Sequence, residues 1–176
     1  EILFNTLQAN GNLSSNNNCG IRMQFLSAFD RLPGSHVQIL YNSISDHRQQ
    51  GTLSHINNSC EQSYGASGIA LRNNRFDPFQ ASKTAYHQGI HIANNIIYLN
   101  GGPAIDIFET DSVSIVNNTL YQNNQNNESR CGEVLSRATG HPTSSSTRRT
   151  YLMQVAGSSA KERAPWVLSL QPSKVS

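Results

Sequence analysis

An acidic turn is the part of this sequence whose residue types are best suited to chemistry. The segment DIFETD supplies Asp106, Glu109 and Asp111 within six residues. Carboxylate oxygens at this density can hold Ca²⁺, which prefers oxygen ligands. In a lyase acting on uronic-acid polymers, such a cation neutralises the substrate carboxylate while a basic side chain removes the neighbouring proton. In a glycosidase, two carboxylates instead share the roles of proton donor and nucleophile or base.

Basic side chains precede this turn in the sequence. Lys83 and His87 lie in the polar insertion RNNRFDPFQASKTAYHQ, and His91 follows it. An inserted loop beside a flat strand face is a common way to form a groove for an extended polymer. The candidate roles are therefore catalysis for Lys83 (as base), His91 and Asp106, substrate binding for Arg22 and His87, and Ca²⁺ ligation for Asp106, Glu109 and Asp111.

Each candidate also has a simpler interpretation. Carboxylates in a turn after a strand are commonly just solvated, and a lysine in a polar insertion is typically a surface residue. His87 and His91 lack a partner at metal-ligand spacing, because an i, i+4 pair is useful only on a helix. Arg22 opposite Asp106 indicates a solvent-face charge pair at most. Both interpretations stay open for this turn.

An internal repeat predicts the elements that position these residues. The segment IHIANNIIYLN is followed 23 residues later by VSIVNNTLYQN, and the same frame fits HVQILYNSIS and EILFNTLQAN upstream. Period-2 alternation in short runs predicts strands. A second register follows the copies, in GIRM, GIAL, AIDI and, more weakly, GEVL. A repeat of short strands separated by Asn and Gly is typical of a parallel β-solenoid, whose successive coils are spaced about 4.8 Å apart.

One asparagine recurs at the same position of each copy. Because asparagine tolerates the left-handed backbone region, it suits a sharp corner between two strands. Stacked side-chain amides can also hydrogen-bond along the stack. Binding of sugar hydroxyls would require these amides to point outward, so the structural role is favoured. The predicted structural ladder consists of Asn5, Asn42, Asn95 and Asn118.

The same alternation predicts which side chains face solvent. With its flanking isoleucines inward, His91 is expected to point to solvent, in line with Gln38 and Ser114. By the same argument Asp106 is expected to point outward, in line with Arg22.

The pattern I-x-x-N-N-T-x-Y-x-N followed by G-x-I-x-I resembles the right-handed parallel β-helix proteins of the pectate-lyase-like superfamily. The resemblance is clear over two coils in residues 89–124 and looser over most of residues 1–135. It implies an all-β fold, a right-handed parallel β-helix of about four coils over residues 1–135. It also implies an extracellular, carbohydrate-active protein that cleaves or binds an acidic polysaccharide, most plausibly as a lyase.

The alternative functions are a non-enzymatic surface or structural solenoid, and a truncated piece of a longer β-helix protein. The superfamily's catalytic segments are not reproduced here. Asn118-Thr119 is followed by Leu120 rather than the Asp of polygalacturonases, and Phe79 stands where mannuronan epimerases have the His of Asp-Pro-His.

The composition changes after Asn127, beyond which asparagine, isoleucine and phenylalanine are absent. Residues 136–176 are therefore predicted to form an irregular tail or cap, in which YLMQV and WVLSL are candidate capping strands.

The sequence begins at Glu1, so we expect either a removed signal peptide or a fragment. A secreted or cell-surface location follows from the resemblance.

Charge and cysteine content exclude some functions. A net charge of +2 without a basic stripe argues against nucleic acid as a partner. No apolar run reaches the roughly 18 residues needed to span a bilayer. Cys19, Cys60 and Cys131 are odd in number and lack Cys-x-x-Cys spacing, which leaves a Cys19–Cys60 disulfide or buried free thiols as alternatives.

Overall fold

The computed structural model describes residues 1–10, 19–26, 34–48, 66–74, 86, 88–110, 112–125 and 132–137, and the backbone of 153–156. Within these residues every strand pairing is parallel and there is no helix. The described part of the chain is therefore all-β, as predicted from the alternating pattern.

The strands form two sheets. The eight-stranded sheet has, in order, β1 (Ile2–Leu3), β4 (Ser35–Leu40), β7 (Gly89–Ala93), β10 (Val113–Tyr121), β8 (Ile96–Tyr98), β5 (Ser43–Ser45) and β2 (Thr6–Gln8), with β12 (Met153–Ala156) also paired to β10. The four-stranded sheet has, in order, β11 (Val134–Arg137), β9 (Ile105–Phe108), β6 (Ile69–Arg72) and β3 (Ile21–Gln24).

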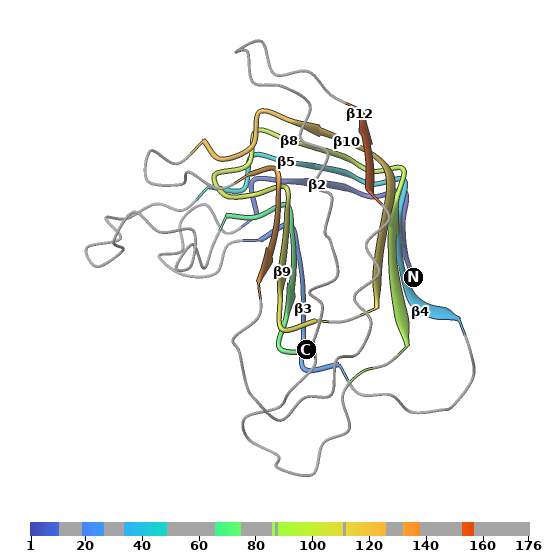
Figure 1. Ribbon diagram of the computed structural model, residues 1–176. Helices are drawn as coiled ribbons and strands as arrows, with labels where there is room; N and C mark the ends of the chain where they lie inside the picture. Colours follow the sequence, from blue (N-terminus) through green and yellow to red (C-terminus); the bar gives the residue numbers. More distant parts are fainter. Residues whose placement is uncertain are drawn as a thin grey trace, which may run out of the picture.

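Figure 1 shows these strands arranged as three walls. The first wall holds β1, β4, β7 and the first half of β10, and the second holds β2, β5, β8 and the second half of β10. The third wall is the four-stranded sheet, which faces the first wall across the interior. The chain passes through the walls in turn, so that β7, β8 and β9 are followed by β10 back on the first wall.

The register of the strands follows the predicted alignment. Ile115 pairs with Ile92, which pairs with Ile39 on its other side. On the third wall, Asp106 pairs with Ala70. The GEVL segment also joins this wall, but one residue out of the predicted register, because Val134 rather than Glu133 pairs with Ile105 and packs against the core. The sequence alignment therefore predicted the pairing of the other strands correctly and that of GEVL wrongly by one residue.

Stacked isoleucines fill the interior between the walls. Ile39, Ile92 and Ile115 are each at most 1% exposed and lie in one core cluster with the apolar residues of the other walls. Full burial of one such side chain contributes roughly 1.5–3 kcal/mol. Because parallel pairing places like residues on like, each added strand extends the same apolar column.

Glycine precedes β6 because the chain passes close to the second wall there. A Cβ atom on Gly68 would lie 2.3 Å from Ile97 Cγ2 and 2.8 Å from the carbonyl oxygen of Ala104. Contacts this short displace the neighbouring strand, so the close approach favours the residue that begins the GIAL segment.

The corners between walls are formed by residues in the left-handed backbone region. At the first corner these are Phe4, Tyr41, Asn94 and Asn117, with φ between 53° and 58°. The expectation that the ladder asparagines themselves adopt this conformation was wrong, because none of Asn5, Asn42, Asn95 and Asn118 has a positive φ. The residue before each ladder asparagine makes the turn. In each Asn-Asn pair, the first asparagine turns the chain and the second enters the ladder.

Relief of this backbone strain is expected to stabilise the protein at Ala9, an exposed residue with φ 53° at the second corner. A left-handed conformation costs an L-residue about 1–2 kcal/mol, and asparagine is among the residues that visit it routinely. We expect Ala9→Asn to raise the free energy of unfolding by about 0.5–1 kcal/mol and Ala9→Val to lower it by about 1 kcal/mol. Urea unfolding measures both changes. If the free energy of unfolding changed in the same direction for the two variants, backbone strain at Ala9 would be contradicted.

A segment of the expected tail joins the first sheet. β12 pairs in parallel with β10, with Met153 opposite Ile115 and Val155 opposite Asn118. The prediction of a strand in YLMQV is thereby confirmed for its last three residues. The WVLSL segment lies outside the described residues.

Candidate functional site

The first asparagine ladder is saturated with hydrogen bonds, and its members Asn42, Asn95 and Asn118 are buried, whereas Asn5 is exposed at its end. The backbone N–H of Asn95 donates to Asn118 Oδ1 at 3.0 Å, and its Nδ2 donates to the same oxygen at 2.9 Å. Asn95 Nδ2 also donates to the carbonyl oxygens of Ile39 at 2.8 Å and Ala93 at 3.1 Å. Asn42 donates in the same way to Asn95 Oδ1. The amides of Asn42 and Asn95 thus hold neighbouring strands together and donate to oxygens of the protein itself.

A second ladder follows the second corner, and it includes a histidine and a glutamate. Its members, in stacking order, are Asn10, His47, Asn100, Asn123 and Glu133. Asn123 ends the amide series by donating its backbone N–H and its Nδ2 to the two carboxylate oxygens of Glu133, at 3.2 and 2.7 Å. Burial raises the pKa of Glu133, and these two hydrogen bonds oppose that shift. Glu133 therefore acts as the acceptor that closes this ladder.

His47 replaces an asparagine in this ladder and is fully buried, at 0% exposure. Its Nδ1 accepts the backbone N–H of Asn10 at 3.1 Å, and its backbone N–H donates to Asn100 Oδ1 at 3.1 Å. Nε2 has no hydrogen-bond partner in the described part of the chain, and a Cβ on Gly20 would lie 2.7 Å from it. Burial lowers the pKa of His47, although the nearby backbone of Asn10 and Leu7 and the charge of Asp46 oppose the shift.

The burial of His47 makes stability depend on pH in a defined direction. The folded pKa lies below the ordinary value of 6.5, so near and below that pH the unfolded chain binds more protons. The contribution of His47 is therefore fully present above pH 6.5 and is lost as the pH falls toward the folded pKa. We expect His47→Asn, which restores the ladder residue, to unfold with a smaller loss of stability on acidification. Denaturant unfolding of both proteins across this range measures the difference, and equal pH slopes would contradict it.

The acidic turn is organised around a buried ion pair. Arg72 on β6 pairs with Asp106 on β9, and the two side chains are 4% and 0% exposed. The expectation that Asp106 faces solvent was therefore wrong. Alternation correctly indicated that its side chain points away from the isoleucine core, but that side of the strand is also buried. The expected partner Arg22 lies two strands away, because Ala70 stands between Arg22 and Asp106 in the register.

The remaining members of the turn are either buried or outside the described residues. Glu109 is 8% exposed and occupies a left-handed corner position with φ 47°. Asp111, Lys83 and His87 lie outside the described residues. Within the described ranges no group of three His, Cys, Asp or Glu side chains is placed to hold a metal ion. Asp106 is thus engaged by Arg72 rather than presented to a cation.

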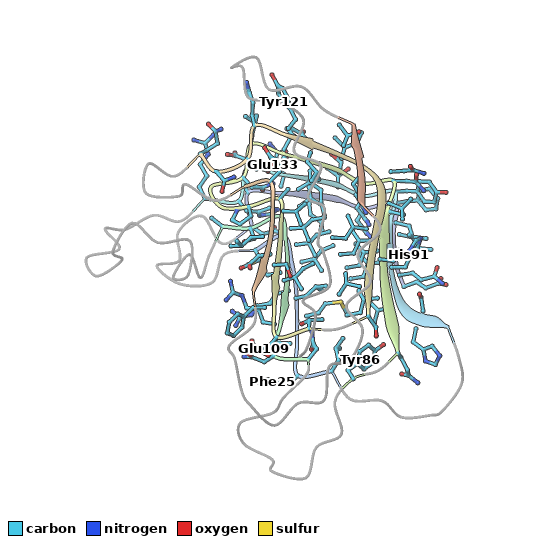
Figure 2. The ribbon with its side chains drawn as sticks, viewed as in Figure 1. Phe25, Tyr86, His91, Glu109, Tyr121 and Glu133 are labelled. Carbon is cyan, nitrogen blue, oxygen red and sulfur yellow. The ribbon has the colours of Figure 1, made fainter. Side chains whose placement is uncertain are left out.

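The outer face of the first wall carries the described polar residues best placed to meet a ligand. His91 on β7 pairs in register with Gln38 on β4 and Ser114 on β10. Its Nδ1 lies 3.2 Å from Ser114 Oγ. All three side chains are half-buried, and Figure 2 shows His91 on the side of the wall away from the core. We call Gln38, His91 and Ser114 the polar column.

Arg22 is exposed on β3, where its Nη2 donates to Gln24 Oε1 at 2.5 Å. This position leaves its guanidinium accessible but away from the polar column, because β3 belongs to the third wall. The structure therefore does not bring Arg22, His91 and Asp106 together in one site.

Cys19 is a free, half-buried thiol whose pKa is raised by burial. Cys60 and Cys131 lie outside the described residues.

Sequence reasoning missed Arg72, His47 and Glu133. The sequence did contain a signal that His47 belongs to the second ladder. His47 follows Ile44 by the same number of residues as Asn100 follows Ile97. No equivalent signal marked Arg72, since its partner lies on a neighbouring strand at a diagonal position.

Comparison with known proteins adds no identification. No protein-family model, curated protein or solved structure matches the chain. None of the described segments forms a helix with the length and apolar character needed to cross a membrane.

Proposed function

We propose that this chain is a right-handed parallel β-helix of the pectate-lyase-like type, secreted or at the cell surface, that binds an extended acidic polysaccharide. The fold proposal is supported by parallel pairing between strands that are 23, 37 or 53 residues apart, with the chain visiting three walls in turn. Ladders of side-chain amides at two corners support it further, because stacked coils place identical residues over one another.

The polar column carries the functional proposal. It places an amide, an imidazole and a hydroxyl on three neighbouring strands, in register and half-buried. Such a row repeats at the strand spacing of about 4.8 Å and offers hydrogen-bond donors and acceptors along the stacking direction. A polymer with repeated hydroxyl and carboxylate groups has the complementary chemistry.

Binding is favoured over cleavage by the state of the acidic turn. A catalytic acid, base or metal ligand must reach the substrate, whereas Asp106 is fully buried against Arg72. A Ca²⁺-dependent lyase stays the second candidate, with Lys83, His87 and Asp111 as its remaining contributors. A purely structural solenoid is the outcome if no polysaccharide is bound.

Affinity electrophoresis in gels containing polygalacturonate, alginate or a neutral glucan tests the binding proposal. We expect the acidic polymers to retard the wild-type chain, and the double variant Gln38→Ala/His91→Ala to bind about tenfold more weakly, since two hydrogen-bonding groups are removed. Thr119→Ala, an exposed change on the second-wall part of β10, is the matched control and should bind as wild type.

The same protein incubated with the acidic polymers and Ca²⁺ tests cleavage. Ultraviolet absorbance from an unsaturated product would favour the lyase, and its loss on addition of a chelator would implicate the cation. Equal mobility of wild type and the double variant in every gel would overturn the binding proposal.

A further inference from the structure

Four exposed side chains run in a row along the first corner, and we infer that this row binds the pyranose rings of the polysaccharide. The inference rests on the proposed function and names a second element of the same binding surface. Neighbouring members lie on hydrogen-bonded strands. The backbone N–H groups of Phe4, Tyr41 and Asn94 each donate to the carbonyl of the residue that precedes the next member, as Tyr41 does to Ala93 at 3.3 Å. We call this set the corner row: Phe4, Tyr41, Asn94 and Asn117.

Two aromatic rings lie side by side in the corner row. Phe4 is 75% exposed and Tyr41 is 51% exposed, which makes them two of the most exposed large apolar side chains in the described residues. Their ring centroids are 5.0 Å apart and the ring planes differ by 4°. The pair therefore forms an ordered apolar surface in solvent rather than two independent side chains.

The left-handed backbone conformation at these positions indicates that the two aromatic residues do not stabilise the fold. Phe4 and Tyr41 have φ of 55° and 58°, a conformation that costs a bulky residue more than an asparagine. Asn94 and Asn117 fill the equivalent positions with the residue that suits the turn. Bulky aromatic residues at a strained, exposed position point to a role outside the fold.

The neighbours of the rings identify the ligand chemistry. Beyond the aromatic pair, the row continues with the amides of Asn94 and Asn117, both exposed. A pyranose ring has an apolar C–H face and equatorial hydroxyl groups, so it matches a row that offers aromatic surface and then amides. A net charge of +2 without a basic stripe does not favour the alternative of stacked nucleobases.

The corner row also continues the proposed binding face. Tyr41 follows Gln38 by three residues, and Asn94 follows His91 by three. Three residues of strand span about 10 Å. The two rows therefore run parallel along the stack, and one polysaccharide chain can contact both.

Isothermal titration of the full chain with polygalacturonate tests the inference. The double variant Phe4→Asn/Tyr41→Asn is expected to bind about tenfold more weakly. Its melting temperature should stay near that of wild type, because relief of the left-handed strain offsets the lost ring contact. Tyr121→Asn removes an aromatic residue that is 39% exposed but outside the row, and should bind normally.

The outcomes separate this inference from the proposal on which it rests. Normal affinity in the double corner variant, combined with weak binding by Gln38→Ala/His91→Ala, overturns the corner row alone. No binding by the wild-type chain overturns both. A sedimentation coefficient that falls in the corner variant without any loss of affinity would assign the rings to self-association and overturn the inference.

Discussion

Replacing Asn95 with alanine is expected to lower the free energy of unfolding by about 5 kcal/mol, because several buried polar groups lose their partners at once. The backbone N–H and Nδ2 of Asn42 would lose an acceptor that now lies 2.9 and 3.0 Å away. The carbonyl oxygens of Ile39 and Ala93 would lose their donor. A loss of this size is a large part of the stability of an ordinary domain.

Two matched variants show whether position in the ladder sets this cost. Asn5 lies exposed at the end of the ladder, and Asn5→Ala is expected to cost about 1 kcal/mol. Asn95→Asp keeps the acceptor but sets a buried carboxylate against the oxygens that Nδ2 now binds, so it should cost at least as much as Asn95→Ala. Chemical denaturation gives all three values. Similar losses for Asn95→Ala and Asn5→Ala would contradict a ladder whose strength comes from burial.

Removing the carboxylate of Asp106 is expected to cost about 4 kcal/mol, because it breaks a buried ion pair with the guanidinium of Arg72. The surface pair of Arg48 and Asp46 provides the control. Arg48 Nε lies 2.6 Å from Asp46 Oδ1, and the two side chains are 52% and 35% exposed. Asp46→Asn, which keeps a residue suited to the left-handed φ of 57° at this position, should cost less than about 1 kcal/mol, since surface ion pairs contribute little. Thermal unfolding of Asp106→Ala and Asp46→Asn measures the contrast.

The double variant Asp106→Leu/Arg72→Met distinguishes a structural pair from a catalytic carboxylate. Replacing both charges with apolar groups of similar size should recover most of the lost stability. Polysaccharide binding should then persist. A variant that is stable and binds the polymer but has lost a cleavage activity present in wild type would instead place Asp106 in the chemistry.

Strand register in the eight-stranded sheet could be predicted from the sequence, because the repeated spacing of isoleucines and asparagines shows which residues lie opposite one another. Ile92 and Ile115 align through the repeated Asn-Asn pairs, and the structure pairs them directly. The short GIRM, GIAL and AIDI segments share the predicted register on the third wall, whereas GEVL joins that wall one residue out of register, with Val134 opposite Ile105. Burial of one face of a strand fixes register strongly, which is why the alternation was informative.

The environment of the acidic turn could not be predicted in the same way. Alternation tells which side of a strand a residue occupies, and it placed Asp106 on the side away from the isoleucine core. It carries no information on whether that side meets water. The pairing with Arg72 depends on a diagonal contact between neighbouring strands, which leaves no period in the sequence. The role of the first asparagine in each Asn-Asn pair was missed for a related reason, since backbone φ is a property of the turn and not of residue type alone.

Side-chain amide hydrogen exchange in the two Asn-Asn pairs, followed by NMR, tests whether the buried ladder amides join the strands of neighbouring repeats. If the second asparagine of each pair holds the walls together, the side-chain amides of Asn95 and Asn118 should exchange slowly, since they donate to buried oxygens at 2.8–3.1 Å. The exposed side-chain amides of Asn94 and Asn117 should exchange rapidly. Fast exchange at all four amides, or protection of the first asparagine and not the second, would contradict the ladder.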